Sequence, residues 1–86
     1  MITHEVIASE ELIPLHFLVR GQLAEIGELV GKPEHVQRLR ELGITSGTLL
    51  EMVQPGSPCI VRLAGQKLCF RDSDVLGILV RPGAAS

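Results

Sequence analysis

The sequence predicts a small, mainly β domain: a partly open barrel of five short strands, with one α-helix after the first strand and a short helical turn before the last. Three observations lead to this fold class. The 86 residues suffice for one domain and are too few for two. Glycine and proline divide the chain into short segments. Apolar residues alternate with polar ones in most of these segments, and only one has clear helical spacing.

The domain is expected to cover residues 13–81, between an N-terminal leader over 1–12 and a flexible tail over 82–86. In the leader, Ser9 is placed to cap one helical turn ahead of Pro14. The sequence has no run of about 20 apolar residues that would span a bilayer. It also has no basic region followed by an apolar stretch, which would mark a signal peptide. We therefore expect a cytoplasmic protein.

The domain begins with one turn and one strand. Leu15 and Leu18 lie three residues apart, which predicts a single turn that packs its apolar side inward. Residues 22–30 then alternate apolar and charged side chains, which predicts the first strand. Gly27 interrupts this alternation and predicts a β-bulge, and Gly31 is expected to end the strand.

The clearest helix runs from Pro33 to Leu42, because proline suits the first helical position, where its missing N–H costs nothing. Its inward side is predicted from three apolar residues spaced three apart, which are Val36, Leu39 and Leu42. Gly43 is expected to end the helix in the left-handed conformation, with Ile44 folded back against the last turn.

The pattern changes from helical to alternating after a turn at Gly47. Residues 48–53 predict a strand, with Leu49 on its outer face. Towards the end of the chain, residues 72–76 predict one helical turn and residues 77–81 the last strand.

Residues 59–63 and 66–70 predict a β-hairpin, with a two-residue turn at Ala64-Gly65 or at Gly65-Gln66. One face of the hairpin is expected to be core: Cys59, Val61, Leu63, Leu68 and Phe70. The other face is expected to be exposed: Ile60, Arg62, Lys67, Cys69 and Arg71. The two cysteines lie on opposite faces, so we expect no disulfide between them within one chain.

Composition argues against several classes of function. The chain has 8 basic and 10 acidic residues, a formal charge of −2, whereas a general nucleic-acid binder needs a basic surplus. The aromatic residues are two Phe, without Trp or Tyr, so base-stacking platforms and aromatic cages are not expected. Two cysteines are too few for a disulfide scaffold and lack zinc-finger spacing.

No motif predicts an enzyme, a cofactor or a metal site. A catalytic nucleophile needs a base, and the base needs a group that orients it. The candidate residues are scattered along the chain: His4, His16, His35, Cys59 and Cys69. No pair among them has the spacing of metal ligands. We therefore expect no catalytic residue, no cofactor and no metal site, with Cys69 at most an adventitious soft ligand.

Binding to another protein is the function class that remains. The candidate contacts are charged or outward apolar residues of the hairpin, the neighbouring strand and the helix: Arg38, Glu41, Leu49, Arg62, Lys67 and Arg71. The hairpin cations suit docking on an acidic surface. On charge alone a solvated face explains them better, and the outward Leu49 favours a contact. An i,i+3 ion pair explains Arg38 and Glu41 equally well.

Four short motifs occur in an order that is typical of one family. They are Leu15-x-x-Leu18-x-x-Gly21-x-x-Ala24-x-Ile26, Arg38-Leu39-x-Glu41-Leu42-Gly43-Ile44-x-x-Gly47-Thr48, Gly65-x-x-Leu68-x-Phe70-Arg71 and Ile78-x-Val80. Together they cover about residues 13–81. In this order and spacing they resemble the FeoA family of ferrous-iron transport accessory proteins.

The resemblance implies an SH3-like barrel with a mainly structural helix-and-turn motif, whose members here are Leu39, Leu42, Gly43, Ile44, Gly47 and Gly65. It implies a cytoplasmic protein that docks on the cytoplasmic G-protein domain of the FeoB-type iron transporter, is recruited by it to the inner face of the membrane, and does not insert itself. Weak homodimerisation stays open. The chain departs from many members at Ser57, where they often have Asp, and in the less basic stretch 37–40.

The resemblance also leaves an alternative. The same domain type occurs at the carboxyl end of iron-dependent repressors. The chain would then be a stand-alone transition-metal-binding or metal-responsive module, with histidines, cysteine or carboxylates as ligands.

Overall fold

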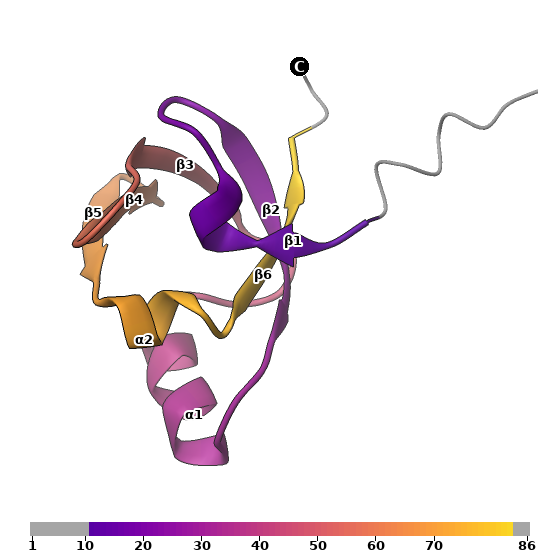
Figure 1. Cartoon of the computed structure of the whole chain (residues 1–86). Helices are drawn as coiled ribbons and strands as arrows, with labels where there is room; N and C mark the ends of the chain where they lie inside the picture. Colours follow the sequence, from indigo (N-terminus) through magenta and orange to yellow (C-terminus); the bar gives the residue numbers. More distant parts are fainter. Residues whose placement is uncertain (1–10, 84–86) are drawn as a thin grey trace, which may run out of the picture.

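The computed structural model describes residues 11–83, apart from the side chain of Asp72. Its strands form one antiparallel sheet in the order β1-β6-β2-β3-β4-β5, which curves around the core (Figure 1). The elements, in chain order, are β1 (Ile13–Pro14), the 3-10 helix η2 (Leu15–Phe17), β2 (Leu23–Leu29), α1 (Pro33–Glu41), β3 (Leu49–Gln54), β4 (Cys59–Leu63), β5 (Gln66–Phe70), α2 (Asp72–Val75) and β6 (Ile78–Pro82). The predicted fold class, an open and mainly β barrel, is confirmed. The turn expected at Ser9 and the end of the tail lie outside the described residues.

The sheet has six strands where the sequence predicted five. The additional strand is β1, in which Ile13 pairs with Val80 and Pro14 with Leu79 of β6. Two residues are too few to show the alternation from which a strand is predicted. Proline has no N–H to donate, so its place in an edge strand is where a sheet tolerates it. Because β1 comes first, α1 follows the second strand and not the first.

The bulge predicted in the first long strand is confirmed. The register between β2 and β6 shifts between Ile26 and Glu28, on either side of Gly27.

The register of the hairpin formed by β4 and β5 shows which of the two predicted turns is present. Leu63 pairs with Gln66, so the turn residues are Ala64 and Gly65, with φ of 53° and 81°. Positive φ at both central positions is the type I′ geometry that matches the twist of a two-residue hairpin.

The core lies on the concave side of the sheet. Its buried members are Leu15, Leu18, Ala24, Ile26, Leu39, Ile44, Leu50, Met52, Cys59, Val61, Leu63, Phe70, Val75, Ile78 and Val80. Within residues 11–83 no polar or charged residue is buried. The predicted core face of the hairpin is confirmed, with Leu68 half-buried against the core. The opposite face is exposed apart from Ile60, which is half-buried. Cys59 is buried and Cys69 exposed, and both are free thiols.

Helix α1 ends in a Schellman motif. The N–H of Ile44 donates to the carbonyl of Leu39 at 3.0 Å, and the N–H of Gly43 donates to that of Arg40 at 2.9 Å. Gly43 has the predicted left-handed conformation, with φ of 99°, and Ile44 is fully buried. Leu42 was expected on the buried stripe and is 46% exposed. The chain reverses at Gly43, so Ile44 takes the core position that the helical spacing assigned to Leu42.

Candidate functional site

A row of side chains crosses four strands on the convex side of the sheet. Leu23 of β2 pairs with Glu51 of β3, Glu51 with Arg62 of β4, and Arg62 with Lys67 of β5. Directly paired residues share a face, so the four side chains are neighbours. Arg62 Nη1 donates to Glu51 Oε1 at 2.8 Å. Lys67 is exposed and belongs to no ion pair among the described residues.

A second row lies beside the first. Glu25 of β2 pairs with Leu49 of β3 and with Arg81 of β6, and Arg81 Nη1 donates to Glu25 Oε1 at 3.2 Å. Leu49 is 66% exposed, and its diagonal neighbour Leu23 is 51% exposed. We call the two rows the outer face: Leu23, Glu25, Leu49, Glu51, Arg62, Lys67 and Arg81. Two exposed leucines there lie among ion pairs.

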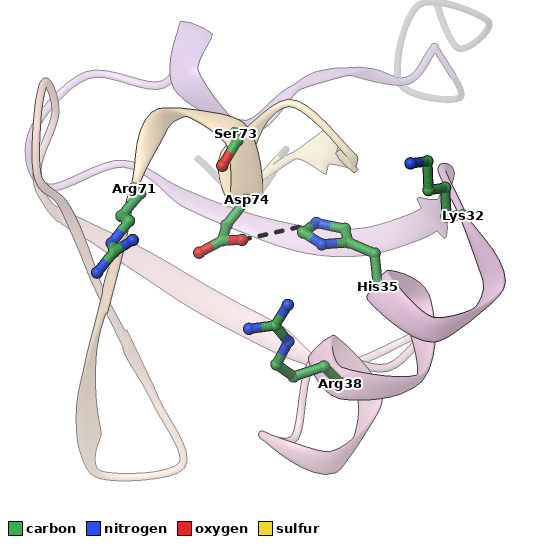
Figure 2. Close-up of a pocket in the computed structure, with 6 residues that line it drawn as sticks. All are labelled: Lys32, His35, Arg38, Arg71, Ser73 and Asp74. Carbon is green, nitrogen blue, oxygen red and sulfur yellow. Dashed lines mark ion pairs between the residues drawn. The ribbon is translucent and has the colours of Figure 1, made fainter.

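A separate pocket of about 530 Å³ opens between α1 and α2 (Figure 2). We call it the cationic pocket, and it is lined by Lys32, His35, Arg38, Arg71, Ser73 and Asp74. His35 and Arg38 are three residues apart on α1, so they share one side of the helix, and Lys32 precedes its first turn. Arg71 follows directly after β5, and α2 supplies Asp74.

The charges of the cationic pocket are poorly balanced. His35 Nε2 lies 3.7 Å from Asp74 Oδ1, and this nitrogen is buried without a hydrogen-bond partner in the described part of the chain. Figure 2 shows Asp74 between His35 and Arg71, with the guanidinium group of Arg38 pointing towards them. Arg38, Arg71 and Lys32 belong to none of the ion pairs found within residues 11–83. The pocket thus has three cationic side chains and one carboxylate, and Lys32 lies on the far side of His35 from Asp74 (Figure 2).

The structure separates the six predicted contacts into two groups and one outlier. Leu49, Arg62 and Lys67 lie on the outer face, as expected. Arg38 and Arg71 line the cationic pocket, so Arg71 belongs with the helices more than with the hairpin face on which it was predicted. Glu41 lies in neither group, and it accepts a hydrogen bond from Gln37 Nε2 at 3.4 Å. The i,i+3 pair between Arg38 and Glu41 is absent from the ion pairs of the described residues.

Sequence reasoning missed the rest of the cationic pocket and one residue of the outer face. The spacing of His35 and Arg38 was visible, yet nothing local to α1 shows that this side faces α2. Asp74 was assigned only to a helical turn. Leu23 was included in a strand, and its exposure follows from the register with Glu51.

The thiols and histidines give no sign of a metal centre in the described part of the chain. No group of three or more His, Cys, Asp and Glu residues there is arranged to hold a metal ion. Burial raises the pKa of the Cys59 thiol, and the charge of Cys69 raises it further. A protonated, buried thiol is a poor nucleophile and a poor ligand. None of the helices within residues 11–83 has the length and apolar character needed to cross a bilayer.

The open, curved sheet with a short helix at one end defines a small SH3-like domain. Comparison with protein families then identifies it more closely. The family model of the FeoA domain matches residues 13–82. The chain therefore belongs to the FeoA family of ferrous-iron transport accessory proteins. The comparison with curated protein sequences gave no match.

Solved structures agree with this assignment. The FeoA protein from Chlorobium tepidum is 30% identical, with a TM-score of 0.76, and the match covers 86% of this chain and 73% of that one. The FeoA protein of Stenotrophomonas maltophilia, solved with zinc, is 26% identical, with a TM-score of 0.71 and coverage of 86% and 93%. The IdeR protein of T. acidophilum is 14% identical, with a TM-score of 0.78 and coverage of 84% and 34%, which shows a shared fold alone.

Proposed function

We propose that this chain is a non-enzymatic accessory protein of ferrous-iron uptake that docks on the cytoplasmic G-protein part of an FeoB-type transporter. Membership of the FeoA family supports the role in iron transport. The observation that carries the docking surface is the pair of exposed leucines, Leu23 and Leu49, beside cations on the outer face. Exposed apolar side chains rimmed by charge are typical of protein–protein contacts.

The charges of the outer face suit an acidic partner. Lys67 has no carboxylate partner among the described residues, so it is available to one on the transporter. Arg62 is held by Glu51, in an exposed pair of the kind that contributes about 0–1 kcal/mol. Exchanging Glu51 for a carboxylate of the partner therefore costs little. Complementary charge of this kind speeds association and sets orientation more than it adds affinity.

The proposed contacts are Arg38, Glu41, Leu49, Arg62, Lys67 and Arg71, with Leu23 added by the structure. The protein would act in the cytoplasm and be recruited to the membrane by its partner. It would need no catalytic residue, because docking on the G-protein part is itself the activity.

The test is a calorimetric titration of the full chain with the purified cytoplasmic G domain of the transporter. We expect the Arg62→Glu and Lys67→Glu double variant to lose at least tenfold in affinity while its melting temperature stays close to that of the parent. A matched control is Arg40→Glu, which reverses an exposed charge of α1 outside both surfaces. Unchanged affinity in a folded double variant would remove the outer face as the docking site.

A second variant separates the ion pair from the docking role. The exchange Glu51→Arg with Arg62→Glu keeps opposite charges face to face, so it should fold like the parent. It also keeps the net charge of the outer face. Loss of binding in this variant would show that the partner reads the position of Arg62 and not only the total charge.

The alternative, a metal-responsive module, has one point in its favour: the Stenotrophomonas maltophilia relative was solved in complex with zinc. It predicts a rise in melting temperature with Fe²⁺, Mn²⁺ or Zn²⁺, because a ligand that binds only the folded state stabilises it. Docking alone predicts no such rise. The same calorimetric sample, titrated with metal in place of the G domain, separates the two.

A further inference from the structure

We infer that the cationic pocket between α1 and α2 binds a phosphate group. This inference does not rest on the docking proposal, because its test uses no partner protein, although Arg38 and Arg71 are also among the proposed docking contacts. The pocket is lined by three cationic side chains, Lys32, Arg38 and Arg71, and by a single carboxylate, Asp74, in a chain whose overall charge is negative. A cleft lined by one sign of charge concentrates the opposite ion.

The charge balance favours a doubly charged ligand. Asp74 faces His35 at 3.7 Å, and neither arginine of the pocket shares an ion pair with it in the described structure. With His35 neutral, the six lining residues carry a surplus of two positive charges. A phosphate monoester has a charge of about −1.5 to −2 at pH 7, which balances this surplus. A single carboxylate has a charge of −1 and would neutralise only half of the surplus.

The hydrogen-bond donors of the pocket also match a phosphate. Two guanidinium groups, Arg38 and Arg71, offer planar forks that bind phosphate oxygens two at a time. Lys32 adds an ammonium group, and Ser73 adds a hydroxyl on the wall formed by α2. The two guanidinium groups can donate to different oxygens of a tetrahedral ligand, whereas a flat carboxylate has only two oxygens to offer, and Lys32, on the far side of His35, adds positive charge to the site (Figure 2).

The pocket also limits what is attached to the phosphate. Its volume of about 530 Å³ exceeds the space that one phosphate fills and lies in the range of small-molecule sites. No Phe, Tyr or Trp lines the pocket, and the imidazole of His35 faces Asp74, so a nucleobase has no large aromatic ring on which to stack. The ligand class is therefore inorganic phosphate or the phosphate ester of a small, polar molecule such as a sugar.

The test is an NMR titration of the labelled full chain, at constant ionic strength and without any partner protein. Its three arms are inorganic phosphate, glucose 6-phosphate and, as the carboxylate control, acetate. We expect saturable shifts of the amides over 32–38 and 71–74 with both phosphates, and none with acetate. Tighter binding of the ester would identify an organic phosphate as the ligand, and equal binding would identify the phosphate group alone. Equal shifts with acetate, or no saturable shift with phosphate, would overturn the inference.

Three variants locate the binding. Arg38→Gln with Arg71→Gln should weaken phosphate binding at least tenfold, while Arg40→Gln, on the same helix outside the pocket, should leave it unchanged. Asp74→Asn should tighten binding several-fold, because it removes the negative charge that faces the ligand. If Asp74→Asn weakened binding and the arginine variant did not, the pocket would take a cation, and the inference would be wrong. The docking titration with the G domain can fail or succeed without affecting any of these outcomes.

Discussion

The carboxyl end of α1 and the side of α1 that faces α2 differ in how completely their groups are paired. At the carboxyl end, Gly43 and Ile44 close a Schellman motif, and Ile44 is buried in the core with its backbone hydrogen bond made. On the side that faces α2, His35 and Arg38 line a pocket where cations outnumber the carboxylate. The carboxyl end stabilises the fold and needs no further partner. The α2-facing side holds surplus positive charge, and we expect changes there to affect binding more than stability.

The largest effect is expected from the core side of α1. Leu39 is 2% exposed and belongs to the main hydrophobic cluster. Leu39→Ala removes buried methyl groups and leaves a cavity, so the free energy of unfolding should fall by about 2–5 kcal/mol. Leu42→Ala is the matched control on the same helix. Because Leu42 is 46% exposed, its replacement should change the free energy of unfolding by about 1 kcal/mol or less.

Urea denaturation of both variants measures this difference. Similar losses for Leu39→Ala and Leu42→Ala would mean that the helix packs in solution as its spacing alone predicts, with Leu42 inward. The reversal of the chain at Gly43 would then be absent.

The next effect concerns the turn that ends α1. Gly43 has a φ of 99°, and a Cβ there would lie 3.3 Å from Leu63 Cδ2. Gly43→Ala should therefore destabilise the protein by about 1–2 kcal/mol for the backbone conformation, with a further loss from crowding Leu63. Gly47 has a similar φ of 92° with no atom within 4 Å of its Cβ position. Gly47→Ala thus isolates the backbone contribution.

The melting temperatures of the two glycine variants give the comparison. We expect Gly43→Ala to melt lower than Gly47→Ala. Equal melting temperatures would show that Leu63 moves aside freely and that the close packing at this end of α1 contributes nothing.

The same contrast explains what sequence reasoning could and could not predict. The Gly43–Ile44 terminator, the bulge at Gly27 and the two faces of the hairpin follow from local rules, because each depends on conformational preferences or alternation within a few residues. The cationic pocket depends on α2 folding back over α1, a contact between His35 and Asp74 that are 39 positions apart in the chain. No local pattern encodes it.

Partial failures have the same origin. Leu42 continues the apolar spacing of the helix, and that spacing alone predicts it to be buried. The chain reverses direction at Gly43, however, and Ile44 takes the core position instead. β1 is too short to be recognised, and it exists because β6 offers an edge to Ile13. The outer face was predicted more completely, because either of the two predicted hairpin turns places Arg62 and Lys67 on the same face of the sheet.

The smallest effect on stability is expected on the side of α1 that faces α2. Arg38 is exposed and belongs to none of the ion pairs found within residues 11–83, and its guanidinium group shares the pocket with Arg71 and Lys32. Replacing it with Gln removes like-charge repulsion and no ion pair, so the free energy of unfolding should change by about 0.5 kcal/mol or less.

Measuring the unfolding of Arg38→Gln by urea in phosphate-free buffer, at low and at high salt, gives the sharpest test of the contrast. If the charge is surplus, the variant should be as stable as the parent at high salt and slightly more stable at low salt, where repulsion between the pocket cations is least screened. A loss of more than about 1 kcal/mol at low salt, removed by added salt, would mean that Arg38 pairs with Asp74 in solution. The positive charge of the pocket would then already be used to hold α1 against α2, and the α2-facing side of the helix would serve the fold as its carboxyl end does.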